Sequence, residues 1–176
     1  DLFFGRDAQI AALRRHVEAL PLTVVLGASG TGKSSLVKAG LVPRLVKDGW
    51  HVLPIMRPGT SPLKALAQVL DAPYAATATM LVPAARASTT DAIRNRLRER
   101  LADPAAPKVV LVLDQFEELI TLSRSPAEGN EMLALLGGLL EEHGTALRLI
   151  FTLRSDFEPN FDRTAFGSRW PAGRFV

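Results

Sequence analysis

The feature that most constrains the fold lies at residues 24–37, VVLGASGTGKSSLV. Three glycines (Gly27, Gly30 and Gly32), a lysine, a threonine and three serines stand here between two apolar segments. The spacing Gly-x₄-Gly-Lys-Ser is that of a phosphate-binding loop, which lies between a buried strand and a helix. A flexible turn without a ligand would explain neither the lysine nor the hydroxyl group after it. The sequence therefore predicts an α/β fold with a phosphate site at this turn.

Each residue type in the loop has a chemical reason. Glycines let successive backbone N–H groups turn inward around a phosphate, and the following helix adds its positive end. Lys33 is expected to bind the β- and γ-phosphates, and the Ser34 hydroxyl to ligate Mg²⁺. The expected nucleotide-contacting residues of the loop are Gly27, Ala28, Ser29, Gly30, Thr31, Gly32, Lys33, Ser34 and Ser35.

The rest of the chain alternates between apolar strands and amphipathic helices. Apolar runs predict strands at 22–26, 50–56, 108–114 and 146–153, with a fifth beginning at 174. The runs at 22–26 and 108–114 are almost wholly apolar, which is typical of strands buried on both faces of a parallel sheet. Apolar residues every three or four positions predict helices, at 6–20, 33–39, 43–49, from 61 onward, at 91–101 and at 127–143. Residues 71–88 are expected to form a loop, and Pro54 indicates a sheet edge. This order predicts a three-layer fold, with helices on both faces of the sheet.

Acidic and basic residues follow the third and fourth predicted strands. Asp114 ends the run VVLVLD, where ligands collect in open α/β sheets, and it is the expected second anchor for Mg²⁺. Glu117 and Glu118 follow, and one of them could orient or deprotonate a water molecule. Arg154 ends the fourth strand and is expected to face a γ-phosphate. The alternatives are favourable charges in the first turn of a helix for the glutamates and a surface ion pair for Arg154.

Composition excludes several classes of protein. The chain of 176 residues, 47% of them hydrophobic, suits one domain. It has no cysteine, so disulfides and thiolate metal sites are excluded. No apolar run is long enough to span a membrane, and a cytoplasmic protein is expected. The 21 basic residues nearly balance the 18 acidic ones, which argues against a nucleic-acid partner.

Longer stretches of the sequence resemble the STAND class of P-loop NTPases (signal-transduction ATPases with numerous domains), in particular the bacterial novel STAND subgroup. DQFEEL and KSSLVKAGL together are more specific than the loop alone. The matching stretches follow the family's order and cover nearly the whole chain: FFGRDAQI, GASGTGKSSLVKAGLVPRL, RPGTSPLKALA, LVLDQFEELITL, FTLRSDFEP and WPAGRFV.

The resemblance implies a core of the ASCE type with strand order 5-1-4-3-2, binding ATP or dATP with Mg²⁺. It implies that Phe4, Gly5 and Arg6 lie near the adenine. It also implies that Asp114 is the metal anchor and that Arg154 is the sensor on the fourth strand. Related NTPases often use the second acid of a pair as the base, which favours Glu118.

Such proteins are switches, in which ATP or ADP in the core controls helical, winged-helix and sensor regions. We therefore expect residues 1–176 to be the NTPase domain of a longer multidomain protein, a slow Mg²⁺-dependent ATPase. It would signal to linked sensor and effector domains or protein partners, with nucleotide-dependent homo-oligomers as one possibility. The alternative is a nucleotide-bound oligomerisation scaffold with negligible hydrolysis.

Three rival classes can be compared with the sequence. A GTPase would need an Asn/Thr-Lys-x-Asp motif, which does not occur. An ABC ATPase would carry its signature before the acidic strand, whereas LLGGL (135–139) follows Asp114. A small-molecule kinase could use the arginine-rich helix 91–101 as a lid, but a solvated helix face explains these arginines better.

Overall fold

The computed structural model describes residues 6–71, 89–103, 105–161 and 165–176. Five parallel strands form one sheet in the order β2-β3-β4-β1-β5. The strands are β1 (Leu22–Gly27), β2 (His51–Val52), β3 (Val109–Leu113), β4 (Leu147–Arg154) and β5 (Arg174–Phe175). Read from the other edge, this order is 5-1-4-3-2, so the predicted ASCE-type arrangement is confirmed. The phosphate-binding loop follows the strand next to one edge, and the Asp114 strand lies two places away.

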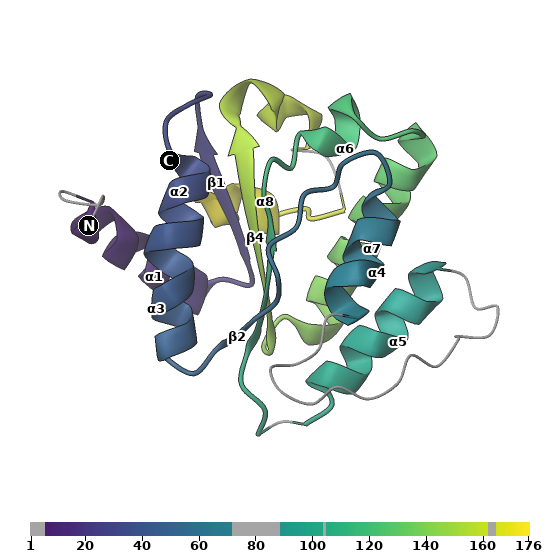
Figure 1. Ribbon diagram of the computed structural model, residues 1–176, viewed down its shortest axis with the longest axis horizontal. Helices are drawn as coiled ribbons and strands as arrows, with labels where there is room; N and C mark the ends of the chain where they lie inside the picture. Colours follow the sequence, from purple (N-terminus) through teal and green to yellow (C-terminus); the bar gives the residue numbers. More distant parts are fainter. Residues whose placement is uncertain (1–5, 72–88, 104, 162–164) are drawn as a thin grey trace.

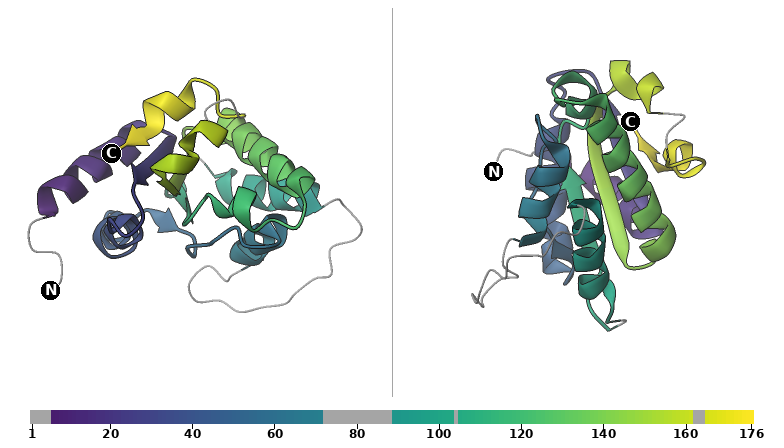
Figure 2. Two further views of the ribbon diagram at one scale, coloured as in Figure 1. Left: turned by 90° about the horizontal axis from the view of Figure 1, so that it is seen from above. Right: turned by 90° about the vertical axis from the view of Figure 1, so that its right-hand side faces the viewer.

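Helices cover both faces of this sheet (Figure 1). They are α1 (Asp7–Ala19), α2 (Lys33–Ser35), the π-helix η1 (Leu36–Leu41), α3 (Val42–Lys47), α4 (Pro62–Asp71), α5 (Thr89–Leu101), α6 (Glu118–Thr121), α7 (Pro126–His143), the 3₁₀ helix η2 (Ser155–Asn160) and α8 (Arg169–Gly173). Figure 2 shows α1 and the α2–α3 segment on one side of the strands and α4, α5 and α7 on the other.

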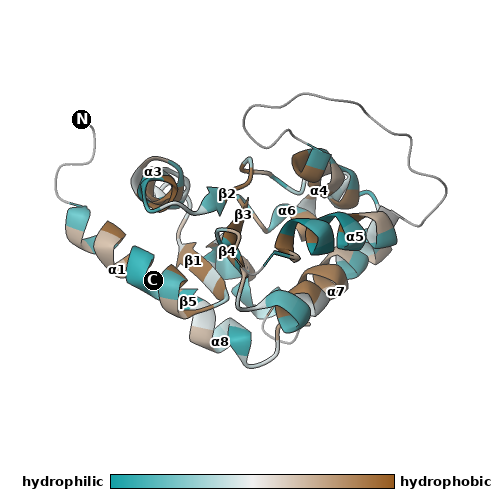
Figure 3. Ribbon diagram, turned by 90° about the horizontal axis from the view of Figure 1, so that it is seen from below, coloured by the Kyte–Doolittle hydropathy of each residue, from teal (hydrophilic) through white to brown (hydrophobic). Residues whose placement is uncertain are grey.

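The two faces of the sheet carry separate apolar cores. Val25, Val110 and Ile150 pack with α1, η1 and α3, whereas their neighbours Val24 and Leu149 belong to the larger core under α4, α5 and α7. This division follows from the alternation of side chains along a strand. All five residues of β3 are buried, and Figure 3 shows the apolar strands enclosed by helices. Residues 22–26 of β1 are buried as well, so the prediction of strands buried on both faces is confirmed for β1 and β3. His51 and Val52 of the edge strand β2 are half-buried.

The helix after the phosphate-binding loop differs from the prediction. Two helices were expected, at 33–39 and 43–49, but helical structure is continuous from Lys33 to Lys47 and includes the π-helix η1. Pro43 lacks an N–H group and crowds the preceding turn of an α-helix. The wider π-helical turn lies directly before it and accommodates it without a break. The Arg44 side chain donates a hydrogen bond to the Gly40 carbonyl, 2.8 Å away, inside this turn.

The second strand is shorter than the predicted 50–56. Only His51 and Val52 form β2, and Met56 adds an isolated bridge to Leu113. Pro54 cannot donate a ladder hydrogen bond and lies between the two pairings. The prediction that Pro54 marks a sheet edge is confirmed, because β2 is the outermost strand.

Other predicted elements lie close to their expected bounds, but three short ones were not predicted. They are the short helices α6, which comes soon after β3, η2, which follows β4, and α8, which precedes β5. The segment predicted as a loop at 71–88 lies, apart from Asp71, outside the described residues. Two arginines of α5 pair with carboxylates of neighbouring helices: Arg96 with Asp71, and Arg98 with Glu142. Within the described part of the chain, no helix is both long and apolar enough to cross a membrane.

Candidate nucleotide-binding site

The phosphate-binding loop connects Gly27, the end of β1, to Lys33, the start of α2. Gly30 and Gly32 have φ angles of 77° and 84°, in the left-handed region that glycine adopts without strain. The Thr31 hydroxyl donates to the Ala28 carbonyl at 2.9 Å and closes the turn. The loop is therefore held in a curved form before any ligand is considered.

The Lys33 ammonium group is turned onto the loop itself. Its Nζ donates to the carbonyl oxygens of Gly27 at 2.8 Å and Ala28 at 2.7 Å. Burial lowers the pKa of Lys33, Glu117 opposes this effect, and the charge of Arg154 adds to it. A phosphate that accepted from Lys33 would replace two neutral acceptors with a charged one, which makes stronger hydrogen bonds.

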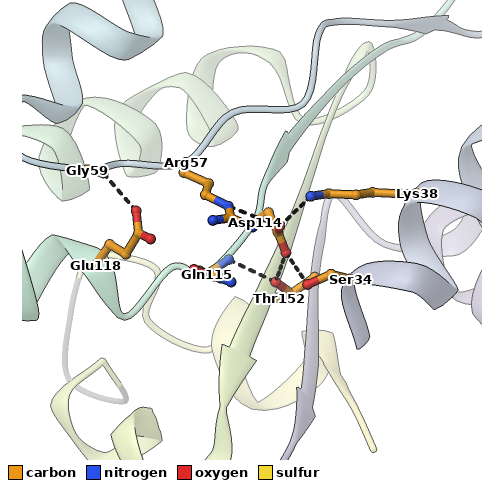
Figure 4. A network of polar contacts seen from close by, with 8 residues as sticks. All are labelled: Ser34, Lys38, Arg57, Gly59, Asp114, Gln115, Glu118 and Thr152. Carbon is orange, nitrogen blue, oxygen red and sulfur yellow. Dashed lines mark hydrogen bonds and ion pairs between the residues drawn. The ribbon is translucent and has the colours of Figure 1, made fainter. Parts of the chain in front are cut away.

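Asp114 and Ser34 meet at the carboxyl end of the sheet, as Figure 4 shows. The Asp114 side chain is fully buried. Its Oδ1 accepts hydrogen bonds from the Ser34 hydroxyl at 2.5 Å and from the Thr152 hydroxyl at 2.7 Å. A hydroxyl and a carboxylate this close are a pair of hard oxygen donors, which suits Mg²⁺.

Two cations that the sequence analysis missed face the other oxygen of this carboxylate. Lys38 Nζ lies 2.6 Å and Arg57 Nε 3.5 Å from Asp114 Oδ2. Burial raises the pKa of Asp114, but hydrogen bonds from Lys38, Ser34 and Thr152 outweigh it and hold that pKa below its usual value. Lys38 follows Ser34 by four residues, one helical turn, so the spacing could have indicated it. Arg57 carried no comparable local signal.

A cleft of about 310 Å³ lies beside the loop and reaches the ends of β3 and β4. Its lining combines most of the loop with residues after Asp114: Ser29, Gly30, Gly32, Lys33, Ser34, Ser35, Gln115, Glu117, Thr152 and Arg154. Of the two predicted glutamates, only Glu117 lines this cleft. Glu118 instead accepts the Gly59 N–H at 3.0 Å and ties down the loop before α4 (Figure 4).

Arg154 lines the same cleft, with its side chain paired to a neighbour. Its Nε and Nη2 lie 3.1 Å and 2.6 Å from the two carboxylate oxygens of Asp156, and the guanidinium stacks over Phe157. Its backbone N–H approaches the Glu117 carboxylate at 3.4 Å. Arg154 therefore forms the surface ion pair that was considered for it. Because it also lines the cleft, its position is compatible with a phosphate contact.

A second cleft, of about 230 Å³, lies on the other side of the loop. Arg6 borders it and donates to the Thr31 carbonyl at 3.2 Å, whereas Phe4 and Gly5 lie outside the described residues. Both clefts include Lys33, so they meet at the loop. The full lining is Arg6, Gln9, Val25, Leu26, Gly27, Thr31, Lys33, Leu36, Phe175 and Val176.

Comparisons with known proteins bear on the family and the fold of the chain. A family model described as Novel STAND NTPase 1 matches residues 1–175. The fold also resembles solved structures of the Aeropyrum pernix ORC1 protein in complex with DNA (TM-score 0.62, 21% identity, covering 96% of this chain and 44% of that one) and of the Aeropyrum pernix ORC2 protein in ADPNP-ADP complexes (TM-score 0.62, 20% identity, 86% and 41%).

A third similar structure is Drosophila ORC bound to DNA, with a TM-score of 0.57 and 17% identity, covering 88% of this chain and 38% of that one. At these identities the likeness establishes the fold alone. The chain spans less than half the length of each of these structures. No curated protein matches the chain in sequence.

Proposed function

The chain belongs to the novel STAND NTPase 1 family, and we propose that it is an ATP-binding and ATP-hydrolysing switch. The observation that carries this proposal is the junction of three elements at one sheet edge. The phosphate-binding loop, the buried Asp114 and the Arg154 strand end meet there, with Ser34 only 2.5 Å from Asp114. Phosphoryl transfer depends on positioned charges more than on covalent chemistry. Lys33, Asp114 and Arg154 place such charges at this edge of the sheet.

In this proposal the loop binds the phosphates and Lys33 exchanges its two carbonyl partners for β- and γ-phosphate oxygens. Ser34 and Asp114 would hold Mg²⁺, which supplies positive charge to the phosphate oxygens when it is bound. Lys38, now 2.6 Å from Asp114, would have to release part of that carboxylate. The donor set fits the ion, because both oxygens are hard ligands and the carboxylate is held ionised by its neighbours.

For hydrolysis, the position of Glu117 in the cleft supports it as the acid that orients or deprotonates water. The resemblance to related NTPases favoured Glu118, but its carboxylate accepts a hydrogen bond from the Gly59 N–H. A general base must reach the proton that it accepts, and only Glu117 lines the phosphate cleft. We therefore assign the base to Glu117 and a supporting role to Glu118.

The cleft on the other side of the loop is the proposed site of the nucleobase. It lies beside Arg6 and is continuous with Lys33, and its aliphatic and aromatic side chains suit a flat base. Adenine is proposed because the sequence lacks the guanine motif. The Aeropyrum pernix ORC2 structure, of similar fold, holds ADPNP and ADP.

We further propose that the nucleotide state is read by linked sensor and effector domains or by protein partners in the cytoplasm, with homo-oligomers as a possible output. Nucleic acid is not proposed as a partner, although two of the similar structures contain DNA. The 21 basic and 18 acidic residues nearly balance, and several arginines are already paired with carboxylates.

Isothermal titration calorimetry with ATP, ADP and GTP in the presence of Mg²⁺ tests the proposal. We expect ATP and ADP to bind and GTP to bind more weakly. Lys33→Ala should weaken ATP binding by about tenfold or more, roughly 1.4 kcal/mol, because it removes the cation at the base of the loop. Lys47→Ala, an exposed lysine at the end of α3, is the matched control and should bind as the wild type does.

Release of γ-phosphate by the full-length protein then separates the two functions still considered. Measurable turnover supports the ATPase. Tight ATP binding without turnover would favour the oligomerisation scaffold, and ATP affinity unchanged by Lys33→Ala would remove the basis of both.

A further inference from the structure

Gln115 has an unusual backbone conformation for a residue with a side chain. Its φ angle is 56°, and it is the one non-glycine residue with positive φ among the described parts of the chain. L-residues other than glycine adopt this left-handed region at a cost in free energy. Such strain persists where the surrounding structure enforces it, and it gathers at functional sites.

The surroundings of Gln115 enforce this conformation. Its N–H donates to the Thr152 hydroxyl at 2.9 Å, and its carbonyl accepts the Glu118 N–H at 2.9 Å, which turns the chain from β3 into α6. The next residue, Phe116, points inward, is fully buried and stacks on Phe151 with ring centroids 3.9 Å apart. The kink therefore fixes Phe116 in the core.

The same kink leaves the Gln115 side chain at the phosphate cleft. Gln115 lines the cleft together with Lys33, Ser34, Glu117 and Arg154. It is the residue that follows Asp114 in the chain. Figure 4 shows it beside Asp114 and Thr152. A neutral amide has both a donor and an acceptor, so it can hold a water molecule against a phosphate without adding charge.

If the left-handed turn served the backbone alone, glycine would be at least as suitable here, because glycine adopts positive φ without strain. The residue found here is instead a glutamine, which adopts the strained conformation and lines the cleft. We propose that Gln115 is a further catalytic residue, whose side-chain amide orients the attacking water toward the γ-phosphate while Glu117 accepts its proton. This assignment rests on the proposed ATPase function.

The step is balanced as a hydrolysis. The water oxygen forms a bond to the γ-phosphorus, the bond from that phosphorus to the β–γ bridging oxygen breaks, and ADP leaves with the electron pair. One water proton passes to Glu117, and Gln115 donates and accepts hydrogen bonds without changing its protonation.

The test compares Gln115→Gly and Gln115→Asn with the wild-type full-length protein. Glycine keeps the turn and removes the amide, whereas asparagine tolerates positive φ and withdraws the amide by one methylene. We expect both variants to bind ATP and ADP with wild-type affinity. Single-turnover hydrolysis should fall by about a hundredfold, as expected when a reacting group is misplaced by about an ångström.

Thermal unfolding and a matched control separate this role from a structural one. The midpoint of Gln115→Gly should be unchanged or higher, because the strained conformation is relieved. Gln68→Asn, at an exposed position on α4, should leave hydrolysis unchanged. Hydrolysis at the wild-type rate in Gln115→Gly would overturn the assignment of Gln115 alone. A wild-type protein that binds or hydrolyses no ATP would overturn the proposed function and this assignment together.

Discussion

At the scale of single residues, the two glutamates after Asp114 make the clearest separation of roles. Glu117 lines the phosphate cleft, and Glu118 accepts the Gly59 N–H at 3.0 Å. We expect Glu117→Gln to lower single-turnover hydrolysis by about a hundredfold or more, the contribution typical of a general base, while ATP stays bound. Glu118→Gln should hydrolyse almost normally, since its amide oxygen can still accept from Gly59.

A third variant, Glu118→Ala, tests the supporting role of Glu118. It removes the acceptor altogether and should loosen the loop that carries Arg57, which lies 3.5 Å from Asp114. A normal rate in Glu117→Gln together with a lost rate in Glu118→Gln would reverse the assignment.

The sequence predicted the meeting of Ser34 and Asp114 but not the division between the glutamates. A phosphate-binding loop after one buried strand and an acid after another fix the first pair at one sheet edge. The directions of Glu117 and Glu118 depend on the left-handed turn at Gln115, which is stabilised by Thr152 on a different strand. No local pattern encodes such a distant contact.

At the scale of elements, strand and helix positions were predicted well where the apolar pattern is clear: a continuous apolar run in β1 and β3, and a helical period in α7. The predictions were wrong where tertiary contacts, rather than the local sequence, determine the structure. Pro43 suggested a helix break, but the π-helix η1 accommodates it, and Gly40 in that turn lies against Ile10 of α1. Arg57 could not be anticipated, because it reaches Asp114 only through the bridge between Met56 and Leu113.

A prediction at this scale concerns Arg148, which joins α1, β4 and α7. It is buried, its pKa is lowered by burial, and its acceptors in the described parts of the chain are backbone carbonyls, among them Val17 at 3.0 Å and Gly144 at 2.7 Å. These lie at the carboxyl ends of two helices, where a cation is favoured. Arg148→Met should lower the free energy of unfolding by about 2 kcal/mol, because buried carbonyls lose their donors.

Urea denaturation measures this loss, with Arg15→Met on the exposed side of α1 as the control. Nucleotide affinity should not change, since Arg148 and Arg154 are six residues apart on β4, about 20 Å. A wild-type unfolding free energy in Arg148→Met would show that the carbonyls find other donors.

At the scale of the whole molecule, a switch must bind ATP and ADP with different free energies, because a ligand that binds two states equally shifts neither. Only ATP carries a γ-phosphate, and Arg154 is the cation in the phosphate cleft with the most freely exchangeable partner. Its ion pair with Asp156 is exposed on both sides, and exposed pairs of this kind contribute only about 0–1 kcal/mol. We therefore expect a γ-phosphate to displace Asp156 from Arg154.

The last prediction follows from that competition. A charge-assisted hydrogen bond contributes about 1.5–3 kcal/mol, so after the loss of the Asp156 pair a net gain of roughly 1.4 kcal/mol remains for ATP, which is about tenfold in affinity. Arg154→Ala should narrow the ATP/ADP affinity ratio by about that factor. Asp156→Asn should widen it, because it frees the guanidinium. ATP and ADP titrations in a Glu117→Gln background, where ATP persists, measure both ratios. Arg169→Ala, a half-exposed arginine on α8, is the control. Equal losses of ATP and ADP affinity in Arg154→Ala would mean that Arg154 does not sense the γ-phosphate, and the switch would have to depend on another residue.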